Sequence, residues 1–223
     1  KIKKAKLRDV ESCGMICSST ELGLPKINDG IMILDESIGK LEIGKPLCEY
    51  PLINDDVIEI GLTPNRGDCQ SIYGVARDLS VYFDLEVKTL GSKEEEEKQP
   101  GVGRVLHLHG SEALDGSYMY KVFDNKEIDV PLIIQLRLGF AEIDNSCLLG
   151  KLIDYSTYVT GVLLRAYNQS CFGAKDEKAK IAIAKDENGL DAIFGLNGQK
   201  VAITGITQIV ECKATAMDER IIV

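Results

Sequence analysis

The sequence is poor in the residues that many hydrolytic and metal-dependent sites require. It contains two histidines, His107 and His109, and no Cys-x-x-Cys pair. Ser-His and Cys-His sites need a histidine beside the nucleophile, so this scarcity argues against such a hydrolase. A phosphate-binding P-loop, a G-x-G-x-x-G turn and an H-E-x-x-H zinc motif are also absent. The motifs that most directly identify an enzyme are therefore missing.

Long apolar runs and an excess of positive charge are absent as well. No apolar run approaches the roughly 20 residues needed to cross a bilayer, and the sequence opens with no secretory leader. There are 26 Lys and Arg against 35 Asp and Glu, which gives a net charge of −9. Duplex DNA is gripped through clustered cations. We therefore expect neither a membrane partner nor a DNA partner.

The seven cysteines are odd in number and scattered, which is atypical of a disulfide framework. Without a leader, the expected location is the cytoplasm, with reduced thiols and no disulfide. Cys13 and Cys17 are four residues apart, but no second pair completes a zinc set. His107 and His109 alternate along a predicted strand, where they form either a surface pair or part of a metal site. No third ligand is visible nearby, so we expect no metal.

The organisation that is present indicates a globular protein of one or two domains. The 223 residues are 44% apolar, which is enough for a sizeable core. Residues 91–103 contain four consecutive Glu flanked by Gly and Pro, which is typical of an exposed acidic linker. The sequence starts at Lys1 rather than Met and stops at Val223 within an apolar stretch. We expect these ends to belong to a piece of a longer protein.

Hydrophobic spacing predicts an α+β fold of mixed sheets with packed helices. The helix at residues 72–83 is indicated by apolar positions three and four apart, with Asp68 as its expected N-cap. Ser18 and Glu21 have the spacing of a capping box, and Asn197-Gly198 is a hairpin signal. Further helices are expected at 131–143 and in the first half of 147–164. Strands are expected at 31–34, 57–62, 105–109, 118–123, 180–184 and 200–203.

The first residues form the one local basic patch. Five positive charges fall within eight residues, at Lys1, Lys3, Lys4, Lys6 and Arg8. A strand with this pattern either contacts nucleic-acid phosphates or is a solvated sheet edge. These five residues are the candidate nucleic-acid contacts.

Two long segments resemble the β subunit of bacterial phenylalanyl-tRNA synthetase. They are AKLRDVESCGMICSSTELGL (5–24) and DDVIEIGLTPNRGDCQSIYGVARDLSVYF (55–83). The second is similar to a family signature of TPNR, an acid, Cys, Ser and Gly-x-Ala-Arg at the same spacing. PLIIQLRLGFAEI, LIDYSTYVTGVLLRAYN and KVAITGIT resemble parts of the family's editing domain more weakly.

The resemblance implies four parts. These are the tail of an OB-type tRNA-binding-like domain (1–57), a small helical piece (58–90), the acidic linker (91–103) and an editing-type domain (104–223). It implies a parent enzyme that joins phenylalanine to tRNA(Phe) with ATP and magnesium. That enzyme is a heterotetramer of two α and two β subunits. Because the α subunit carries aminoacylation, no catalytic residue and no cofactor are expected in this segment.

The resemblance also implies a candidate editing pocket at Ser156, Thr157, Arg165 and Gly205. Ser156 stands where the family has Thr, and Thr157 where it has Asn. Arg165 replaces the family's His, and about three residues before Gly161 are missing. An arginine is protonated at neutral pH and cannot act as a base. We therefore predict a mainly structural segment with a degenerate editing site. The alternatives are an active editing domain that hydrolyses Tyr-tRNA(Phe), or a free-standing RNA-binding module.

Overall fold

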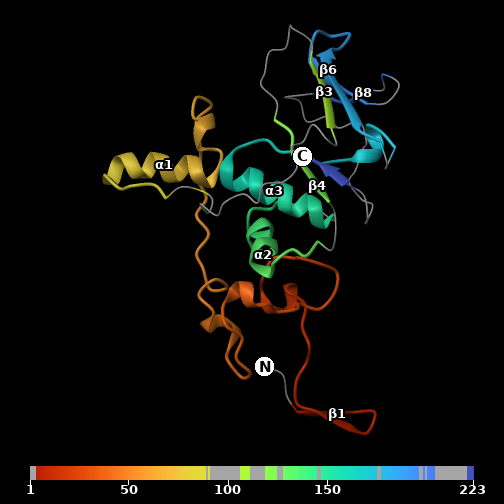
Figure 1. The fold of residues 1–223 in the computed structure, drawn as a ribbon. Helices are drawn as coiled ribbons and strands as arrows, with labels where there is room; N and C mark the ends of the chain where they lie inside the picture. The colour runs from red at the N-terminus through yellow and green to blue at the C-terminus, as the bar shows by residue number, and fades with distance from the viewer. Residues whose placement is uncertain are drawn as a thin grey trace. The chain divides into compact units, whose positions relative to one another are not determined.

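The protein has an α+β fold in a computed structural model (Figure 1). The structure describes residues 4–88, 90, 106–110, 119–124, 128–144, 147–174, 177–195, 198, 200–203 and 220–223. Helices and short strands alternate along these residues, and the strands form three separate sheets. None of the helices in the described residues is long and apolar enough to span a bilayer.

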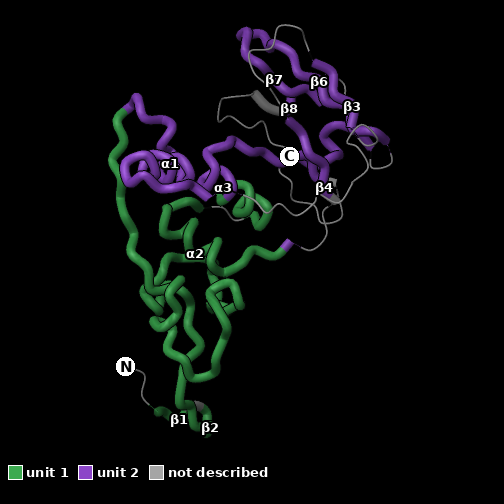
Figure 2. The backbone as a smooth tube through the Cα atoms, turned by 60° about the vertical axis from the view of Figure 1, so that its left-hand side comes forward, with its two compact units in different colours: residues 1–63, 129–155 green, residues 64–128, 156–223 purple. Residues whose placement is uncertain are grey.

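The chain divides into two compact units, each made of two separate segments (Figure 2). Unit 1 comprises Lys1–Thr63 and Asp129–Tyr155, and unit 2 comprises Pro64–Ile128 and Ser156–Val223. These bounds differ from the predicted sequential parts, because residues 129–155 group with the first 63 residues. Whether the two units correspond to OB-type and editing-type domains stays a prediction.

Unit 1 is rich in loops and short turns. A hairpin joins β1 (Ala5–Leu7) and β2 (Val10–Ser12), and 3-10 turns follow as η1 (Thr20–Leu22), η2 (Glu36–Ile38) and η3 (Leu47–Glu49). The predicted capping box is confirmed: the Ser18 N–H donates to Glu21 Oε2 at 2.8 Å, and the Glu21 N–H donates to Ser18 Oγ at 3.4 Å. The second segment supplies α2 (Leu132–Phe140) and the start of α3 (Leu148–Thr160).

The predicted strands at residues 31–34 and 57–62 are wrong, because neither segment lies in a sheet of the described chain. Ile33 is 73% exposed and Ile58 is 80% exposed. β-branched residues favour a strand only where a partner strand and an apolar layer are available. These two segments have the composition of strands, but no strand pairs with them among the described residues.

The core of unit 1 forms where the loops of the first segment cover α2. Leu132 and Leu136 lie one turn apart on one face of α2, and each is 1% exposed. They pack with apolar side chains of the loops, which are Ile27, Ile38, Tyr50 and Ile53. Polar contacts accompany this packing, because Lys151 of α3 donates from Nζ to the carbonyl of Ile27 at 3.0 Å. The apolar face of α2 is thus covered by residues that lie at least 79 positions earlier in the chain.

Asp35 and Ser37 cap α2 from a distant part of the sequence. Pro131 precedes this helix and makes no side-chain cap. The Leu132 N–H instead donates to Asp35 Oδ2 at 2.7 Å, and the Ile133 N–H donates to Ser37 Oγ at 3.1 Å. Burial raises the pKa of Asp35, but the hydrogen bonds from Ser37 and from the Leu132 N–H outweigh it and lower the pKa overall. The N-terminal donors of α2 are therefore satisfied within the unit.

Replacing Asp35 with alanine is expected to destabilise unit 1 by about 1–2 kcal/mol, the usual range for the loss of a helix cap. Because the folded pKa is lowered, the stabilisation is present above the ordinary pKa. It is lost as the pH falls through the lowered value. Urea unfolding at pH 7 and in acid measures both effects. Glu36→Ala is the matched control, since Glu36 is exposed. An equal loss in both variants would contradict the capping role.

Among the described residues, unit 2 holds two small sheets, the helix α1 (Ile72–Phe83) and the end of α3. The first sheet has the order β3-β6-β7-β8, with β3 (Leu106–Gly110) parallel to β6 (Ala179–Lys185). β7 (Asp191–Phe194) and β8 (Lys200–Ile203) continue it as antiparallel neighbours. Gly198 lies in the connection between β7 and β8 with a φ of +72°, which confirms the predicted hairpin.

The second sheet has the order β4-β9-β5, and all of its pairs are antiparallel. Its strands are β4 (Val122–Asp124), β9 (Arg220–Ile222) and β5 (Tyr167–Asn168), and the turn η6 (Gln169–Cys171) follows β5. Neither β5 nor β9 was expected from the sequence, because each is too short to show alternation. Cys171 is disulfide-bonded, so the prediction of reduced thiols is wrong at this position. The spacing of cysteines in a sequence does not show which of them fold close together.

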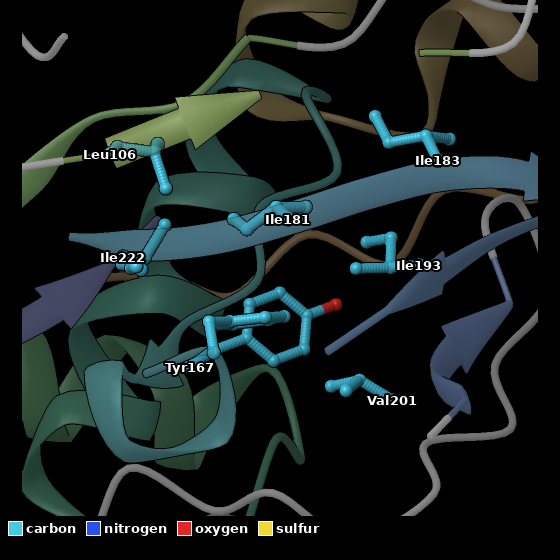
Figure 3. Packing of buried hydrophobic residues seen from close by; sticks show 9 residues of the cluster. Leu106, Tyr167, Ile181, Ile183, Ile193, Val201 and Ile222 are labelled. Carbon is cyan, nitrogen blue, oxygen red and sulfur yellow. The ribbon is translucent and has the colours of Figure 1, made fainter. Parts of the chain in front are cut away.

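One core joins the two sheets of unit 2 (Figure 3). Leu106 and Ile181 come from the first sheet, and Tyr167 and Ile222 come from the second. Phe172 is fully buried, and its ring meets that of Tyr167 edge to face with centroids 5.8 Å apart. Such contacts add to the area that aromatic rings bury. This core places the segment that precedes Tyr167, which includes Arg165.

Candidate functional site

The candidate editing residues lie at the end of α3 and in the segment that follows it. Ser156 and Thr157 belong to the last part of α3, and Arg165 stands two residues before the buried Tyr167 of β5. Arg165 is half-buried. Gly205, the fourth predicted member, lies outside the described residues. The structure therefore places three of the four predicted residues, all within ten positions of one another in unit 2.

The end of α3 is closed by its own hydroxyl groups. The Gly161 N–H donates to the Thr157 carbonyl at 2.8 Å, and Gly161 has a φ of +76°, which allows the chain to leave the helix. Thr160 Oγ1 donates to the Ser156 carbonyl at 2.7 Å and accepts from the Val162 N–H at 3.1 Å. Thr157 Oγ1 accepts from the Leu164 N–H at 3.4 Å. The hydroxyl of Thr157 thus helps to hold the turn that leads to Arg165.

Arg165 affects the electrostatics of the neighbouring strand. Burial raises the pKa of Tyr167, and the positive charge of Arg165 acts in the opposite direction without cancelling it. Tyr167 is therefore a neutral phenol at physiological pH. The side chain of Arg165 offers only hydrogen-bond donors and a fixed positive charge. Chemically it can bind an anion or a carbonyl oxygen, but it cannot accept a proton from water.

A second cluster of ionisable residues lies where η4 (Gly67–Cys69) meets α1 (Ile72–Phe83). The Arg66 guanidinium donates to both carboxylate oxygens of Asp68 at 3.0 Å and to Asp78 Oδ1 at 2.7 Å. The same Arg66 terminal nitrogen lies 2.8 Å from Cys69 Sγ. Sequence reasoning singled out this segment as a motif and missed the pairing of Arg66 with Asp78, which is 12 residues away.

The two carboxylates and the thiol of this cluster could in principle hold a metal ion, because their ligand atoms lie within 4.8 Å of one another. The Arg66 guanidinium contacts all three and already supplies the positive charge. Hydrogen bonds from Arg66 lower the pKa of Asp68 to about 2, and those to Asp68 and Asp78 raise the pKa of Arg66. Burial and a hydrogen bond to Asp68 raise the pKa of Cys69. The cluster is therefore an ion-paired group at the junction of η4 and α1, and its thiol is protonated.

The same ion-paired cluster lies at the start of α1. The predicted helix is confirmed, but an N-cap at Asp68 would have started it at residue 69, whereas α1 begins at Ile72. Ser71, and not Asp68 as predicted, is the N-cap, because its Oγ accepts from the Gly74 N–H at 3.0 Å. Asp68 is occupied by Arg66 instead. A Cβ at position 74 would lie 1.8 Å from the Asp68 carbonyl oxygen. Gly74 therefore permits the close approach of α1 to η4.

Replacing Arg66 with alanine is expected to raise the pKa of Asp68 from about 2 toward the ordinary aspartate value near ~3.9, because the two hydrogen bonds that stabilise the carboxylate are removed. A ¹³C NMR titration of the aspartate carboxyl groups measures the change. Arg77→Ala is the control, since Arg77 is an exposed arginine of the adjacent helix α1. If Asp68 kept a pKa close to 2 in the Arg66 variant, the pairing would be contradicted.

The predicted nucleic-acid contacts lie partly in the β1–β2 hairpin of unit 1. Lys1 and Lys3 are outside the described residues. Lys4 Nζ lies 2.7 Å from Glu11 Oε2, and Lys6 Nζ lies 3.2 Å from Asp9 Oδ1. Arg8 occupies the hairpin turn with a φ of +50°. The two described lysines thus carry acidic neighbours, which lowers the positive potential available to a phosphate.

His107 and His109 both lie on β3 and are exposed. Among the residues that the structure describes, the cluster of Asp68, Cys69 and Asp78 is the one group of three potential metal ligands, and neither histidine belongs to it. The described part of the chain therefore gives the histidine pair no third ligand.

The relatives of this chain are subunits of an aminoacyl-tRNA synthetase. The sequence is 47% identical to a protein of Wolinella succinogenes over 213 residues, which cover 93% of this chain and 27% of the relative. It is 50% identical to a protein of Campylobacter jejuni over 189 residues, covering 84% of this chain and 24% of the relative. A protein of Pseudomonas putida is 32% identical over 94% of this chain and 25% of its own length. No family model matches the sequence.

All three relatives are named phenylalanine–tRNA ligase β subunit, and the chain belongs to that family. The resemblance seen in the sequence is thereby confirmed. The chain spans about a quarter of the length of these relatives.

Proposed function

We propose that this chain is a non-aminoacylating, mainly structural segment of the β subunit of a phenylalanine–tRNA ligase, with a degenerate editing site. The observation that carries the proposal is the combination of Arg165 in the place of a histidine with a Thr157 hydroxyl that serves the turn after α3. The relatives, at up to 50% identity, support the parent enzyme. In this proposal the whole enzyme charges tRNA(Phe) with phenylalanine, using ATP and magnesium.

The proposed partners follow from the same parent enzyme. They are the α subunit, in a heterotetramer of two α and two β subunits, and tRNA(Phe), all in the cytoplasm. A net charge of −9 and the acidic neighbours of Lys4 and Lys6 favour a tRNA contact made mainly by other parts of the enzyme. A free-standing RNA-binding module is therefore the weaker interpretation.

Loss of editing has a chemical reason at Arg165. Hydrolysis of an aminoacyl ester requires a water molecule that is positioned and deprotonated near the carbonyl carbon. Arginine stays protonated at neutral pH, so it supplies no base. The competing function, an active editing domain, requires Arg165 to bind the substrate through a phosphate or carbonyl oxygen while another group positions the water. The half-buried position of Arg165 beside Tyr167 is the feature that this alternative would use.

The proposal predicts that a complete enzyme carrying this segment accumulates Tyr-tRNA(Phe) when it is given tyrosine, ATP and tRNA(Phe). Replacing Ser156, Thr157 and Arg165 together with alanine should change neither the amount of Tyr-tRNA(Phe) formed nor the rate of phenylalanine charging by more than about twofold relative to the parental enzyme. The measurement is the yield of radiolabelled Tyr-tRNA and Phe-tRNA over time. If the parental enzyme formed no Tyr-tRNA(Phe) and the triple variant formed it, the site would be active and the proposal overturned.

A further inference from the structure

Residues 57–62 form an extended apolar segment that the rest of the described chain leaves bare. Every second residue from Ile58 onward is apolar, so Ile58, Ile60 and Leu62 share one face when the backbone is extended. They are 80%, 52% and 40% exposed, and Val57 on the opposite face is 64% exposed. Figure 1 shows the orange chain between η3 and η4 as a trace with neither helix nor arrow. The segment thus has the pattern of a half-buried strand without the burial.

The backbone of this segment is equally unpartnered. Within the part of the chain that the structure describes, residues 57–62 make no hydrogen bond to another segment. A row of free N–H and C=O groups beside apolar, β-branched side chains is a template for another strand. Six residues also match the usual length of a strand in a globular protein. Strand addition, in which extended segments pair through their main-chain hydrogen bonds, is a mode of recognition that uses these groups.

The charge of the segment restricts what can pair with it. Asp55, Asp56 and Glu59 are its charged residues, and residues 55–62 contain no Lys or Arg. Cross-strand pairs of opposite charge stabilise a sheet, and like charges directly opposite destabilise it. A partner strand would therefore place apolar residues opposite Ile58, Ile60 and Leu62. It would place Lys or Arg opposite the three acidic residues.

We infer that residues 57–62 are a docking edge for a β-strand supplied by the part of the β subunit that lies outside these 223 residues. The relatives support this occupant, because they align along 84–94% of this chain and are about four times as long. Most of such a subunit therefore lies elsewhere, and a bare apolar strand within it would be an aggregation site. The inference rests on membership of the family and is independent of whether editing survives.

Amide hydrogen exchange, read by mass spectrometry, tests this inference. In the 223-residue chain the amides of residues 57–62 should exchange at nearly the unprotected rate. In a complete β subunit bound to its α subunit, they should exchange at least about 100-fold more slowly. Pairing along one edge protects alternate amides, because successive N–H groups of a strand point to opposite edges. Peptides of β6 serve as an internal reference for global folding.

Ile60→Lys in the complete subunit should restore fast exchange at residues 57–62 while β6 stays protected. Ile43→Lys is the matched control, since Ile43 is a fully exposed isoleucine of the same unit. Equal exchange of residues 57–62 in the short chain and the complete subunit would overturn the inference. Protection already present in the short chain would also overturn it, as would protection that rises with its concentration and therefore comes from a second copy.

Discussion

Phe172→Ala is expected to lower the unfolding free energy of unit 2 by about 3–5 kcal/mol, the range seen when a buried aromatic side chain is removed. Phe172 is fully buried in the core that joins the two sheets. Its removal costs the transfer energy of the ring, leaves a cavity and ends the edge-to-face contact with Tyr167. A loss of this size approaches the whole stability of a small domain.

Denaturant unfolding with hydrogen exchange at β6 measures this loss, because β6 contributes Ile181 and Ile183 to the same core. Phe83→Ala is the matched control, since Phe83 is 58% exposed on α1 of the same unit. We expect the control to change the unfolding free energy by less than about 0.5 kcal/mol. Similar losses in the two variants would show that the core of unit 2 lies elsewhere.

Leu136→Ala is expected to destabilise unit 1 by about 2–5 kcal/mol. Leu136 is 1% exposed and packs under the loops that contain Ile38 and Tyr50. Loops bury few backbone hydrogen bonds of their own, so the apolar face of α2 supplies much of the energy that orders them. The effect of this single change should therefore extend over the first segment of the unit.

The loss in the Leu136 variant is measured by the urea midpoint and by exchange in peptides around η2. Leu22→Ala serves as its control, because Leu22 belongs to the same unit and is 44% exposed. A midpoint for Leu136→Ala that matches the control would contradict the proposed packing of α2 against the first segment.

Local patterns of the sequence were sufficient to predict where helices form. The spacing of apolar residues between 72 and 83, with a turn sequence at 63–67 before them, predicted the helix α1, although the expected N-cap at Asp68 lies three residues before the observed one at Ser71. The capping box of Ser18 and Glu21 was equally readable, because its two partners lie three residues apart. Such features depend on neighbours in the chain, which a sequence displays directly.

Long-range pairings were not predictable from one sequence. The grouping of residues 129–155 with the first segment depends on Asp35, which caps a helix 97 positions later. The pairing of Arg66 with Asp78 is another contact that no spacing rule indicates. Residues 57–62 were predicted as a strand from composition alone, and β-propensity has no effect without a partner strand.

The candidate editing site was predicted from resemblance rather than from physical chemistry. Ser156, Thr157 and Arg165 were named by their positions in a family pattern, and no periodicity or charge distinguishes them. The structure adds that the hydroxyl groups of Thr157 and Thr160 hold the turn after α3. That local role could not be inferred from the sequence, because the helix end at Gly161 had not been placed.

Hydrolysis of pre-charged Tyr-tRNA(Phe) tests the central claim most directly. The complete enzyme is mixed in excess with Tyr-tRNA(Phe), and the fraction of ester that remains is followed over time. Arg165→Ala and Arg165→His are compared with the parental enzyme. We predict that the parental enzyme and Arg165→Ala hydrolyse the ester no faster than buffer within about twofold. Rapid hydrolysis by the parental enzyme that is lost in Arg165→Ala would show an active editing site and contradict the account.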